Sequence, residues 1–273
     1  MLDLTYISDS DVSAHIEKYL AKEAPDTPRW RILSSVLLLA KHFSFSDNRT
    51  YPRPDHPDPE KRKPLIFMLA AILISLRTTL ENEQKAVLAL IRRYPTENDL
   101  FGAQVHELKD VIHVAGMPER RAKTIRRALD YVELQFGGHL ETLLEMKTGL
   151  AREALLKIPG VGPKSADCLL SIGLGKPSIA VDVNVFRVTS WLFRLHSEVP
   201  INYNDSEAVS AVKRLLDANI PRDPFACQIV HTLFLLYGKK SGRNHPSYGN
   251  CILADMCLTC LAEQQQLALP LSR

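Results

Sequence analysis

Two short segments of this chain combine residue types that can form and break a covalent bond. The first, IPGVGPK, runs from Ile158 to Lys164 and ends in a lysine, and the second, VDVNVFR, runs from Val181 to Arg187 and contains an aspartate. A lysine amine attacks an electrophilic carbon only when it is neutral, and burial or nearby positive charge lowers its pKa toward that state. A carboxylate can assist this deprotonation and stabilise positive charge on the reacting group. Lys164 and Asp182 are therefore candidates for a nucleophile and its partner.

The glycines of the first segment predict a turn that can hold a phosphate. Gly160 and Gly162 carry no Cβ, so backbone amides can approach a ligand closely there. Pro163 suits the first position of a helix, where its missing N–H would have no partner. Apolar residues recur at helical spacing on both sides of the turn, over residues 149–172, which predicts that it joins two helices. Lys164 then lies in the first turn of the second helix, whose N-terminus is electropositive.

The rest of the chain predicts an all-α protein, because apolar residues repeat at about 3.6 residues and no alternating strand pattern is found. Helix caps are expected at Thr27, Asp182, Asp223 and at Asp205 or its neighbours. The segment 51–64 contains five prolines and is expected to be an extended linker or loop. The expected helices, apart from the hairpin pair and one that follows Thr27, cover 65–76, 80–94, 96–102, 105–115, 119–136, 183–195, a stretch from about 205 and one from 224 to Gly238.

Composition and charge exclude little but favour an intracellular protein. Of the 273 residues 45% are hydrophobic and 24% are charged, which is ordinary for a globular protein. A net charge of +3 permits nucleic-acid binding without establishing it. Basic residues cluster at 120–127 and at 61–63, where they could equally be a solvated face. No membrane-spanning run or signal peptide is found, so a monomer of the cytoplasm or nucleoid, with no membrane contact, is expected.

Hairpin, lysine and aspartate together resemble the helix-hairpin-helix DNA glycosylases, and Lys164 makes the similarity greatest to the endonuclease III family. The similarity extends over residues 28–257 and implies two helical lobes with DNA between them. A six-helix barrel would comprise residues 58–176, and the second lobe would combine 1–57 with 177–273. In that family the lysine just after the hairpin is the nucleophile and the aspartate is its catalytic partner. The alternatives are that Lys164 only contacts phosphate and that Asp182 only caps a helix.

The resemblance also implies a set of DNA contacts. Ser75 to Thr79 (SLRTT) is similar to a family segment whose long polar residue fills the gap left by a flipped base, a role that falls to Arg77 unless it is only a salt-bridged turn residue. Arg121 replaces a family lysine and keeps a charge for phosphate, and Asn184 is either a phosphate contact or solvent-exposed. The hairpin residues expected at the DNA backbone are Ile158, Gly160, Val161, Gly162, Pro163 and Ser165.

The C-terminal cysteines depart from the family pattern, which usually has four cysteines that hold a [4Fe-4S] cluster. When Cys251 and Cys257 are aligned with the last two ligands, the first two fall at Ser241 or Gly242 and at Tyr248, which cannot serve. A second alignment uses Cys251, Cys257 and Cys260 but places Gln266 fourth. The cluster set is incomplete, and a loop without any cofactor is expected. The alternative is a zinc ion held by His245 with Cys251, Cys257 and Cys260.

These observations predict a bifunctional DNA glycosylase and AP lyase of base excision repair. Its partner would be double-stranded DNA with a damaged base, expected to be an oxidised pyrimidine, or with an abasic site. The first alternative is a monofunctional mismatch or adenine-type glycosylase, which needs the aspartate but not the lysine. The second is a non-catalytic helix-hairpin-helix module that binds DNA. Neither alternative accounts for the joint presence of Lys164 and Asp182.

Overall fold

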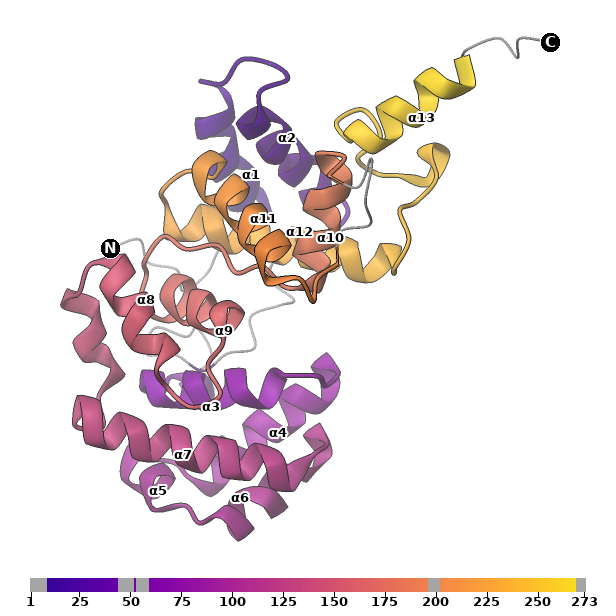
Figure 1. The fold of residues 1–273 in the computed structure, drawn as a ribbon. Coiled ribbons are helices and arrows are strands. Elements are labelled where there is room, and N and C mark those ends of the chain that lie inside the picture. The colour runs from indigo at the N-terminus through magenta and orange to yellow at the C-terminus, as the bar shows by residue number, and fades with distance from the viewer. Residues whose placement is uncertain (1–8, 44–51, 53–58, 196–201, 269–273) are drawn as a thin grey trace. The chain divides into compact units, whose positions relative to one another are not determined.

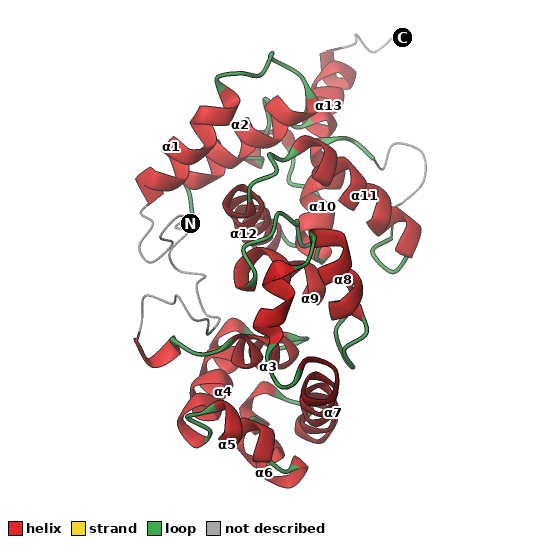
Figure 2. Ribbon diagram, turned by 90° about the vertical axis from the view of Figure 1, so that its left-hand side faces the viewer, coloured by secondary structure: helices red, strands yellow, loops and turns green. Residues whose placement is uncertain are grey.

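The computed structural model describes residues 9–43, 52, 59–195 and 202–268 of the chain. Its regular structure over these residues is entirely helical (Figure 2), so the prediction of an all-α protein is confirmed. The chain forms two compact units, and each is described by itself. Among the described residues, unit 1 comprises 52 and 59–176, and unit 2 comprises 9–43, 177–195 and 202–268.

Unit 1 is organised around one helix that is apolar on every side. This helix, α3 (Leu65–Ser75), has the sequence LIFMLAAILIS and buries every side chain from Leu65 to Ile74. A helix without a polar face has to be enclosed, and α3 packs against α4 and α7. The other helical elements of unit 1 are η2 (Pro59–Lys61), α4 (Leu80–Arg93), α5 (Glu97–Gly102), α6 (Val105–Val111), η3 (His113–Ala115), α7 (Pro118–Phe136), η4 (Leu140–Glu145), α8 (Thr148–Leu156), α9 (Pro163–Cys168) and η5 (Leu169–Gly173).

The two hairpin helices are α8 and α9, drawn in pink to salmon in Figure 1. The second was predicted as one helix over 163–172, but α9 ends at Cys168 and continues into the π-helical turn η5. The amides of Leu174 and Lys176 donate to the carbonyls of Leu169 and Leu170 at 2.9 and 2.8 Å, so the wider turn is closed by regular hydrogen bonds. The hairpin thus lies just before the end of unit 1.

Unit 2 combines helices from both ends of the chain. It contains α1 (Asp9–Leu20), α2 (Pro28–Ala40), α10 (Val183–Leu192), α11 (Ser206–Asn219), α12 (Pro224–Ser241), η6 (Tyr248–Asn250) and α13 (Leu258–Ala268). The central helix α12 packs against α10 and α2. The caps predicted at Thr27, Asp182, Asp205 and Asp223 are all present, each accepting amide hydrogen bonds from the first turn of its helix.

The prediction that α12 ends at Gly238 was wrong, because this glycine serves close packing. A Cβ on Gly238 would lie 2.7 Å from the Cβ of Asn184 and 2.9 Å from its carbonyl oxygen. The missing side chain therefore lets the backbone of α12 approach that of α10, and α12 continues to Ser241. The start of α10 is held in place by this contact.

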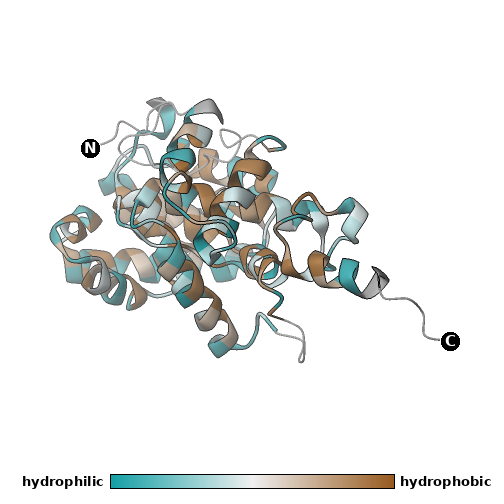
Figure 3. Ribbon diagram, turned by 90° about the horizontal axis from the view of Figure 1, so that it is seen from above, coloured by the Kyte–Doolittle hydropathy of each residue, from teal (hydrophilic) through white to brown (hydrophobic). Residues whose placement is uncertain are grey.

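Hydropathy alternates around most helices, as the mixed teal and brown ribbon of Figure 3 shows. Within the described part of the chain, no helix is long and apolar enough to span a membrane. Only residues 52 and 59–64 of the predicted linker are described, and they include the short turn η2.

Candidate functional site

The hairpin of unit 1 turns at two glycines whose surroundings differ. Gly160 has a φ of +86°, and a Cβ there would lie 2.3 Å from Cγ2 of Thr124 and 3.1 Å from Cδ2 of Leu73. It is therefore required both by the left-handed backbone and by the contact of the turn with α7 and α3. Gly162 has a φ of −94°, and no heavy atom outside its immediate neighbours lies within 4 Å of its Cβ position among the described residues. Nothing in the fold of unit 1 needs a glycine there.

The hairpin exposes backbone at Gly160, and its second half offers both side chains and backbone to a ligand. Pro163 is exposed, and Gly162 and Lys164 are half-buried. The side chains of Ile158, Val161 and Ser165 are buried, and the amide of Val161 already donates to the carbonyl of Ile158 at 3.0 Å. These three side chains therefore pack the hairpin against the rest of unit 1, and the predicted contact of the hairpin with the DNA backbone stays a prediction.

Lys164 occupies the place that the sequence predicted for it, in the first turn of α9. Pro163 precedes it at the first helical position and Gly162 caps the helix with extended backbone. The amide of Ala166 donates to the carbonyl of Gly162 at 2.9 Å, so the α-helical hydrogen-bond pattern begins at the cap. The lysine thus extends from a fixed backbone position beside the open glycine.

Arg77 lies on a strained turn between α3 and α4. Its φ is +57°, in the left-handed region that non-glycine residues rarely adopt, and its side chain is exposed. Such strain persists only where the surrounding structure determines the conformation, and it is concentrated at functional positions. The placement agrees with an arginine that extends from unit 1 toward a ligand.

Arg121 binds the carbonyl that directly precedes Arg77 and is almost completely buried. Its side chain, only 5% exposed, donates to five backbone carbonyls. Three of these carbonyls, of Leu73, Ile74 and Leu76, end helix α3, and the other two belong to Ala115 and Gly116. The predicted phosphate contact by Arg121 is therefore corrected, since its donors are committed to carbonyls. Burial lowers the pKa of this arginine.

A second exposed residue on a left-handed turn was missed by the sequence analysis. Met117 has a φ of +48°, is 43% exposed and precedes the first turn of α7. Arg121 ties this turn to the one that carries Arg77, because its guanidinium bonds both Gly116 and Leu76. An apolar residue between a glycine and a helix-starting proline, in Gly116-Met117-Pro118, was the available signal.

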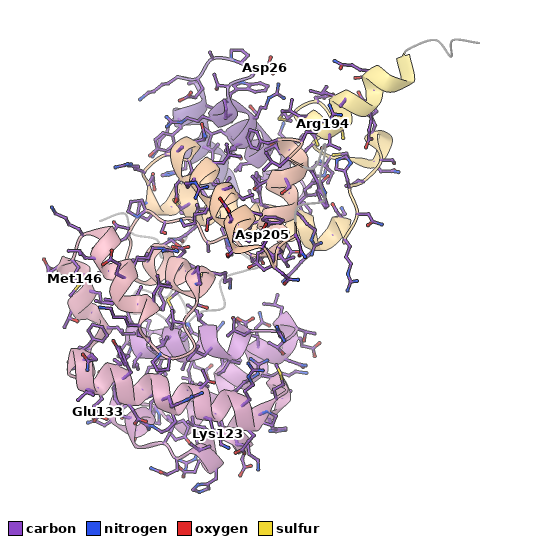
Figure 4. All side chains as sticks on the ribbon, viewed as in Figure 1. Asp26, Lys123, Glu133, Met146, Arg194 and Asp205 are labelled. Atoms are coloured by element: carbon purple, nitrogen blue, oxygen red, sulfur yellow. The ribbon has the colours of Figure 1, made fainter. Side chains whose placement is uncertain are left out.

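The basic cluster predicted at 120–127 divides in the structure. Arg121 is buried, and Arg126 bonds Asp130 and the carbonyls of Phe101 and Ala103. Lys123, labelled on α7 in Figure 4, pairs with Glu119 at 2.9 Å. Arg120 and Arg127 are exposed and flank Thr124, the residue that faces Gly160 of the hairpin. These two arginines are the basic side chains of α7 that lie toward the hairpin turn.

Asp182 starts α10 in unit 2. Its Oδ1 accepts from the amides of Asn184 and Val185, both at 2.8 Å, so it is an N-cap. Its Oδ2 accepts from Nδ2 of Asn184 at 3.3 Å. Asn184 is 8% exposed and packs against Gly238, so its predicted solvent exposure is corrected, while its predicted phosphate contact stays a prediction. Its amide holds the carboxylate in one orientation, with Oδ2 the less committed oxygen.

The structure brings together the four residues that the zinc alternative named. The Nε2 atom of His245 lies 3.4 Å from Sγ of Cys257 and 3.6 Å from Sγ of Cys260. With Cys251 they present four ligand atoms that all lie within 4.8 Å of one another. The three cysteines are buried, and the His245 side chain is 13% exposed. The group is a candidate metal centre in unit 2.

The protonation of the three thiols is strongly interdependent. Hydrogen bonding from Cys257 above all, opposed by burial and aided by His245 and Tyr237, lowers the pKa of Cys251 to about 4. Burial and the hydrogen bond with Cys251 raise the pKa of Cys260 to about 12. The other two cysteines, Cys168 and Cys227, are buried outside this group, as predicted.

Comparisons with known proteins agree on one family. Residues 70–213 match the HhH-GPD superfamily base excision DNA repair protein family, and this region contains both the hairpin and Asp182. The chain belongs to that superfamily, and it is a DNA glycosylase similar to endonuclease III.

The individual relatives compared are named either endonuclease III or thymine-DNA glycosylase. Endonuclease III of Thermotoga maritima is 32% identical over 153 residues, which span 56% of this chain and 66% of the relative. Thymine-DNA glycosylase of Aeropyrum pernix is 25% identical over 77% of this chain and 89% of the relative. Among solved structures, a thermostable thymine-DNA glycosylase has a TM-score of 0.66 at 20% identity and covers 88% of this chain and 100% of its own. A trapped endonuclease III–DNA covalent intermediate has a TM-score of 0.63 at 24% identity, covering 86% and 98%. Both show the same fold.

Proposed function

We propose that this glycosylase is bifunctional: it removes a damaged base from duplex DNA and then cuts the strand at the resulting abasic site. The observation that carries the proposal is the position of Lys164, in the first turn of α9 and two residues after Gly162, the glycine with open space at its Cβ position. A purely hydrolytic glycosylase has no need of an amine at this place. The chemistry expected of Lys164 and Asp182 comes from the family resemblance.

The proposed reaction uses Lys164 as nucleophile. Its neutral Nζ attacks C1′ of the flipped nucleotide, and the bond from C1′ to the base breaks with the electron pair leaving on the base. The sugar opens to an imine with Nζ. The imine acidifies the proton on C2′, and loss of that proton expels the 3′ phosphate by β-elimination. Hydrolysis of the imine returns the free lysine.

Asp182 is proposed to accept the proton from the Lys164 amine and to stabilise positive charge on the sugar. Its fixed orientation supports this role, because Oδ1 is committed to the two amides of α10 while Oδ2 accepts only from the Asn184 side chain among the bonds described. A carboxylate that is already oriented needs no reorganisation as charge develops.

We further propose that two strained turns of unit 1 enter the duplex. Arg77 fills the place of the flipped base, and Met117 wedges between neighbouring bases as an apolar side chain. Exposure and left-handed backbone at both residues support this assignment. The hairpin backbone at Gly162 would contact phosphate, flanked by the arginines Arg120 and Arg127 of α7. Duplex DNA with an oxidised pyrimidine or an abasic site is the proposed substrate.

Borohydride trapping tests the proposed nucleophile. Wild-type protein should be trapped covalently on a duplex with one abasic site, and Lys164→Gln should bind this DNA without being trapped. Lys157→Gln is the matched control, since Lys157 is an exposed lysine at the end of α8 in the same hairpin. Trapping of Lys164→Gln at the wild-type level would assign the nucleophile to another amine.

The second candidate is a monofunctional glycosylase of mismatched thymine or uracil, favoured by the names of two relatives, the Aeropyrum pernix protein and a thymine/uracil-DNA glycosylase of Pyrobaculum aerophilum. A panel of duplexes, each with one oxidised pyrimidine, mismatched thymine or uracil, separates the two. Base release and strand cutting are measured independently. Release of thymine or uracil with no cutting and no trapping would favour this second candidate.

A further inference from the structure

The geometry of His245, Cys251, Cys257 and Cys260 points to a structural zinc site, and we propose that this chain binds one Zn²⁺ ion where its family usually carries an iron–sulfur cluster. The proposal depends only on these four residues and their neighbours in unit 2. It is independent of the proposed reaction.

A [4Fe-4S] cluster does not fit these residues. Such a cluster takes four cysteine thiolates, each on a different iron of an eight-atom core. Here the described residues at this place supply three thiols and one imidazole, and their four ligand atoms all lie within 4.8 Å of one another. Ligand atoms so close together cannot enclose four irons and four sulfides. The positions where the family pattern would place the missing cysteines carry Tyr248 and Ser241 or Gly242.

One tetrahedral ion does fit them. With Zn–S near 2.3 Å and Zn–N near 2.0–2.1 Å, tetrahedral geometry places a sulfur and a nitrogen ligand about 3.6 Å apart. The Nε2 atom of His245 lies 3.4 Å from Sγ of Cys257 and 3.6 Å from Sγ of Cys260. The order His245, Cys251, Cys257, Cys260 ends in a C-x2-C pair, a spacing typical of zinc chelation.

The neighbours of His245 suit a metal ligand. Its Nε2 faces the thiols, which leaves Nδ1 on the far side of the ring. This buried Nδ1 has no hydrogen-bond partner within the described residues, and Oε1 of Glu263 lies 3.6 Å from it. A histidine that binds zinc generally directs its other ring nitrogen to a carboxylate, which fixes the tautomer. The edge of the imidazole ring also packs against Trp191, with ring centroids 5.5 Å apart.

Such an ion would fix the fold of the C-terminal segment, which contacts α10 and α12 in the core of unit 2. Cys257 Sγ donates to the carbonyl of Trp191 in α10 at 3.2 Å, and the hydroxyl of Tyr237 in α12 lies 3.2 Å from Cys251 Sγ. When Cys257 loses its proton to bind zinc, the Trp191 carbonyl still accepts from Thr259 Oγ1 at 2.7 Å. Four protein ligands complete the tetrahedron, so the ion has no open position for substrate and its role is structural.

Metal analysis of the full-length chain, purified without a metal-affinity tag or chelator, tests the proposal. We expect colourless protein with about one zinc per chain. A brown preparation with about four irons per chain would overturn it, as would one iron per chain, metal-free protein or a disulfide among these cysteines.

Variants assign the ligands. Cys260→Ser and His245→Ala should lose the zinc, whereas His245→Cys should retain it because four thiolates also bind zinc. Cys227→Ser is the matched control, since Cys227 is an equally buried thiol of α12 outside the group. Full zinc in both Cys260→Ser and His245→Ala would overturn the assignment.

Cobalt substitution provides a readout on the wild-type chain, in case the ligand variants fail to fold. Protein expressed with Co²⁺ should show the intense visible absorption of a tetrahedral cobalt thiolate, and His245→Cys should shift the sulfur-to-cobalt charge-transfer band. An octahedral spectrum or the absence of bound cobalt would overturn the proposal. Loss of zinc should also lower the Tm, because metal binding contributes folding free energy.

Discussion

Arg152 and Asp167 connect the two hairpin helices through a buried carboxylate: Nε of Arg152 in α8 lies 2.8 Å from Oδ1 of Asp167 in α9, and Nη2 lies 3.4 Å from Oδ2. The aspartate side chain is 1% exposed and the arginine side chain 32%. The pair fixes α9, and with it Lys164, relative to α8. A loop of two glycines would not by itself fix that relationship.

Removal of one partner should therefore destabilise the hairpin. Arg152→Met removes this ion pair from the buried Asp167 carboxylate, and we expect the free energy of unfolding to fall by about 3 kcal/mol. Urea denaturation measures it, with Lys85→Met as control because the Lys85–Glu81 pair on α4 is exposed and should contribute little. An equal, small change in both variants would show that the buried pair does not hold the hairpin.

Replacement of Arg121 should affect both strained turns at once. Arg121→Lys keeps the charge but loses the planar set of donors that serves five carbonyls, so buried acceptors lose their partners. We expect a loss of about 2–4 kcal/mol in the free energy of unfolding. Arg120→Lys, one residue earlier and exposed, should leave stability unchanged.

DNA binding by Arg121→Lys shows whether the two turns are disordered, apart from any loss of overall stability. Under conditions where Arg121→Lys is fully folded, it should bind lesion duplexes more weakly relative to undamaged DNA, because Arg77 and Met117 are no longer held. Unchanged discrimination between the two DNAs would mean that Arg121 supports only the fold.

Asp182→Asn should separate catalysis from capping. Asparagine keeps the oxygen that accepts from the amides of Asn184 and Val185, so stability should change by less than about 1 kcal/mol. Loss of the charge should lower turnover by orders of magnitude if the carboxylate assists Lys164. Asp205→Asn is the matched control, because Asp205, labelled in Figure 4, caps α11 through the same Oδ1 geometry. Equal activity in the two variants would reduce Asp182 to a helix cap.

How far the sequence predicts this molecule depends on the range of the interactions involved. Helix types and caps at Asp182, Asp205 and Asp223 depend on neighbouring residues and were readable. The role of Gly238 was not, because a glycine at a helix end and a glycine at a helix crossing look alike until the partner, Asn184, is known. Arg121 was misread for the same reason: three of its five carbonyl partners lie 45–48 residues away at the end of α3.

In the candidate site, too, features that depend on neighbouring residues were predicted and those that depend on distant residues were not. The position of Lys164 follows from a local pattern of glycine, proline and helix start. The convergence of His245 with three cysteines depends on how the segment after α12 folds back onto α10, so spacing alone left several ligand sets open. Met117 adopts a left-handed conformation that methionine disfavours, so its residue type alone did not predict the turn that exposes it.

Acid and base should both loosen the contact of α1 with α12. Burial would raise the pKa of Asp223, but hydrogen bonds from His15 at 2.7 Å and Tyr19 at 2.6 Å hold it well below its usual range. A depressed carboxylate pKa contributes stability at pH values above about 4, and this is lost as the pH falls through the folded-state pKa. We expect Asp223→Asn to flatten the acid limb of the free energy of unfolding plotted against pH, and exposed Asp130→Asn to leave it unchanged.

At alkaline pH the free energy of unfolding should instead fall as the pH rises. Burial, followed by the hydrogen bond to Asp223, raises the pKa of Tyr19 to about 12 from 10.0. A raised pKa contributes stability that is complete below pH 10 and is lost as the pH rises through 12. Tyr19→Phe should remove this dependence. An unchanged alkaline limb would show that Tyr19 and Asp223 do not interact in solution.

The two hairpin glycines should respond in opposite ways to alanine. Gly160→Ala places a methyl group 2.3 Å from Cγ2 of Thr124 on a backbone with a φ of +86°, so stability should fall by more than about 1 kcal/mol. The double variant with Thr124→Ser removes the colliding methyl group and should recover part of the loss, leaving the backbone strain.

Gly162→Ala has open space and an ordinary φ of −94°, so it should fold at least as well as wild type. If DNA phosphate approaches the backbone at this point, however, the new methyl group should weaken DNA binding several-fold, which fluorescence anisotropy with an abasic duplex measures. Wild-type affinity in Gly162→Ala would show that the open glycine does not serve close approach of the DNA backbone.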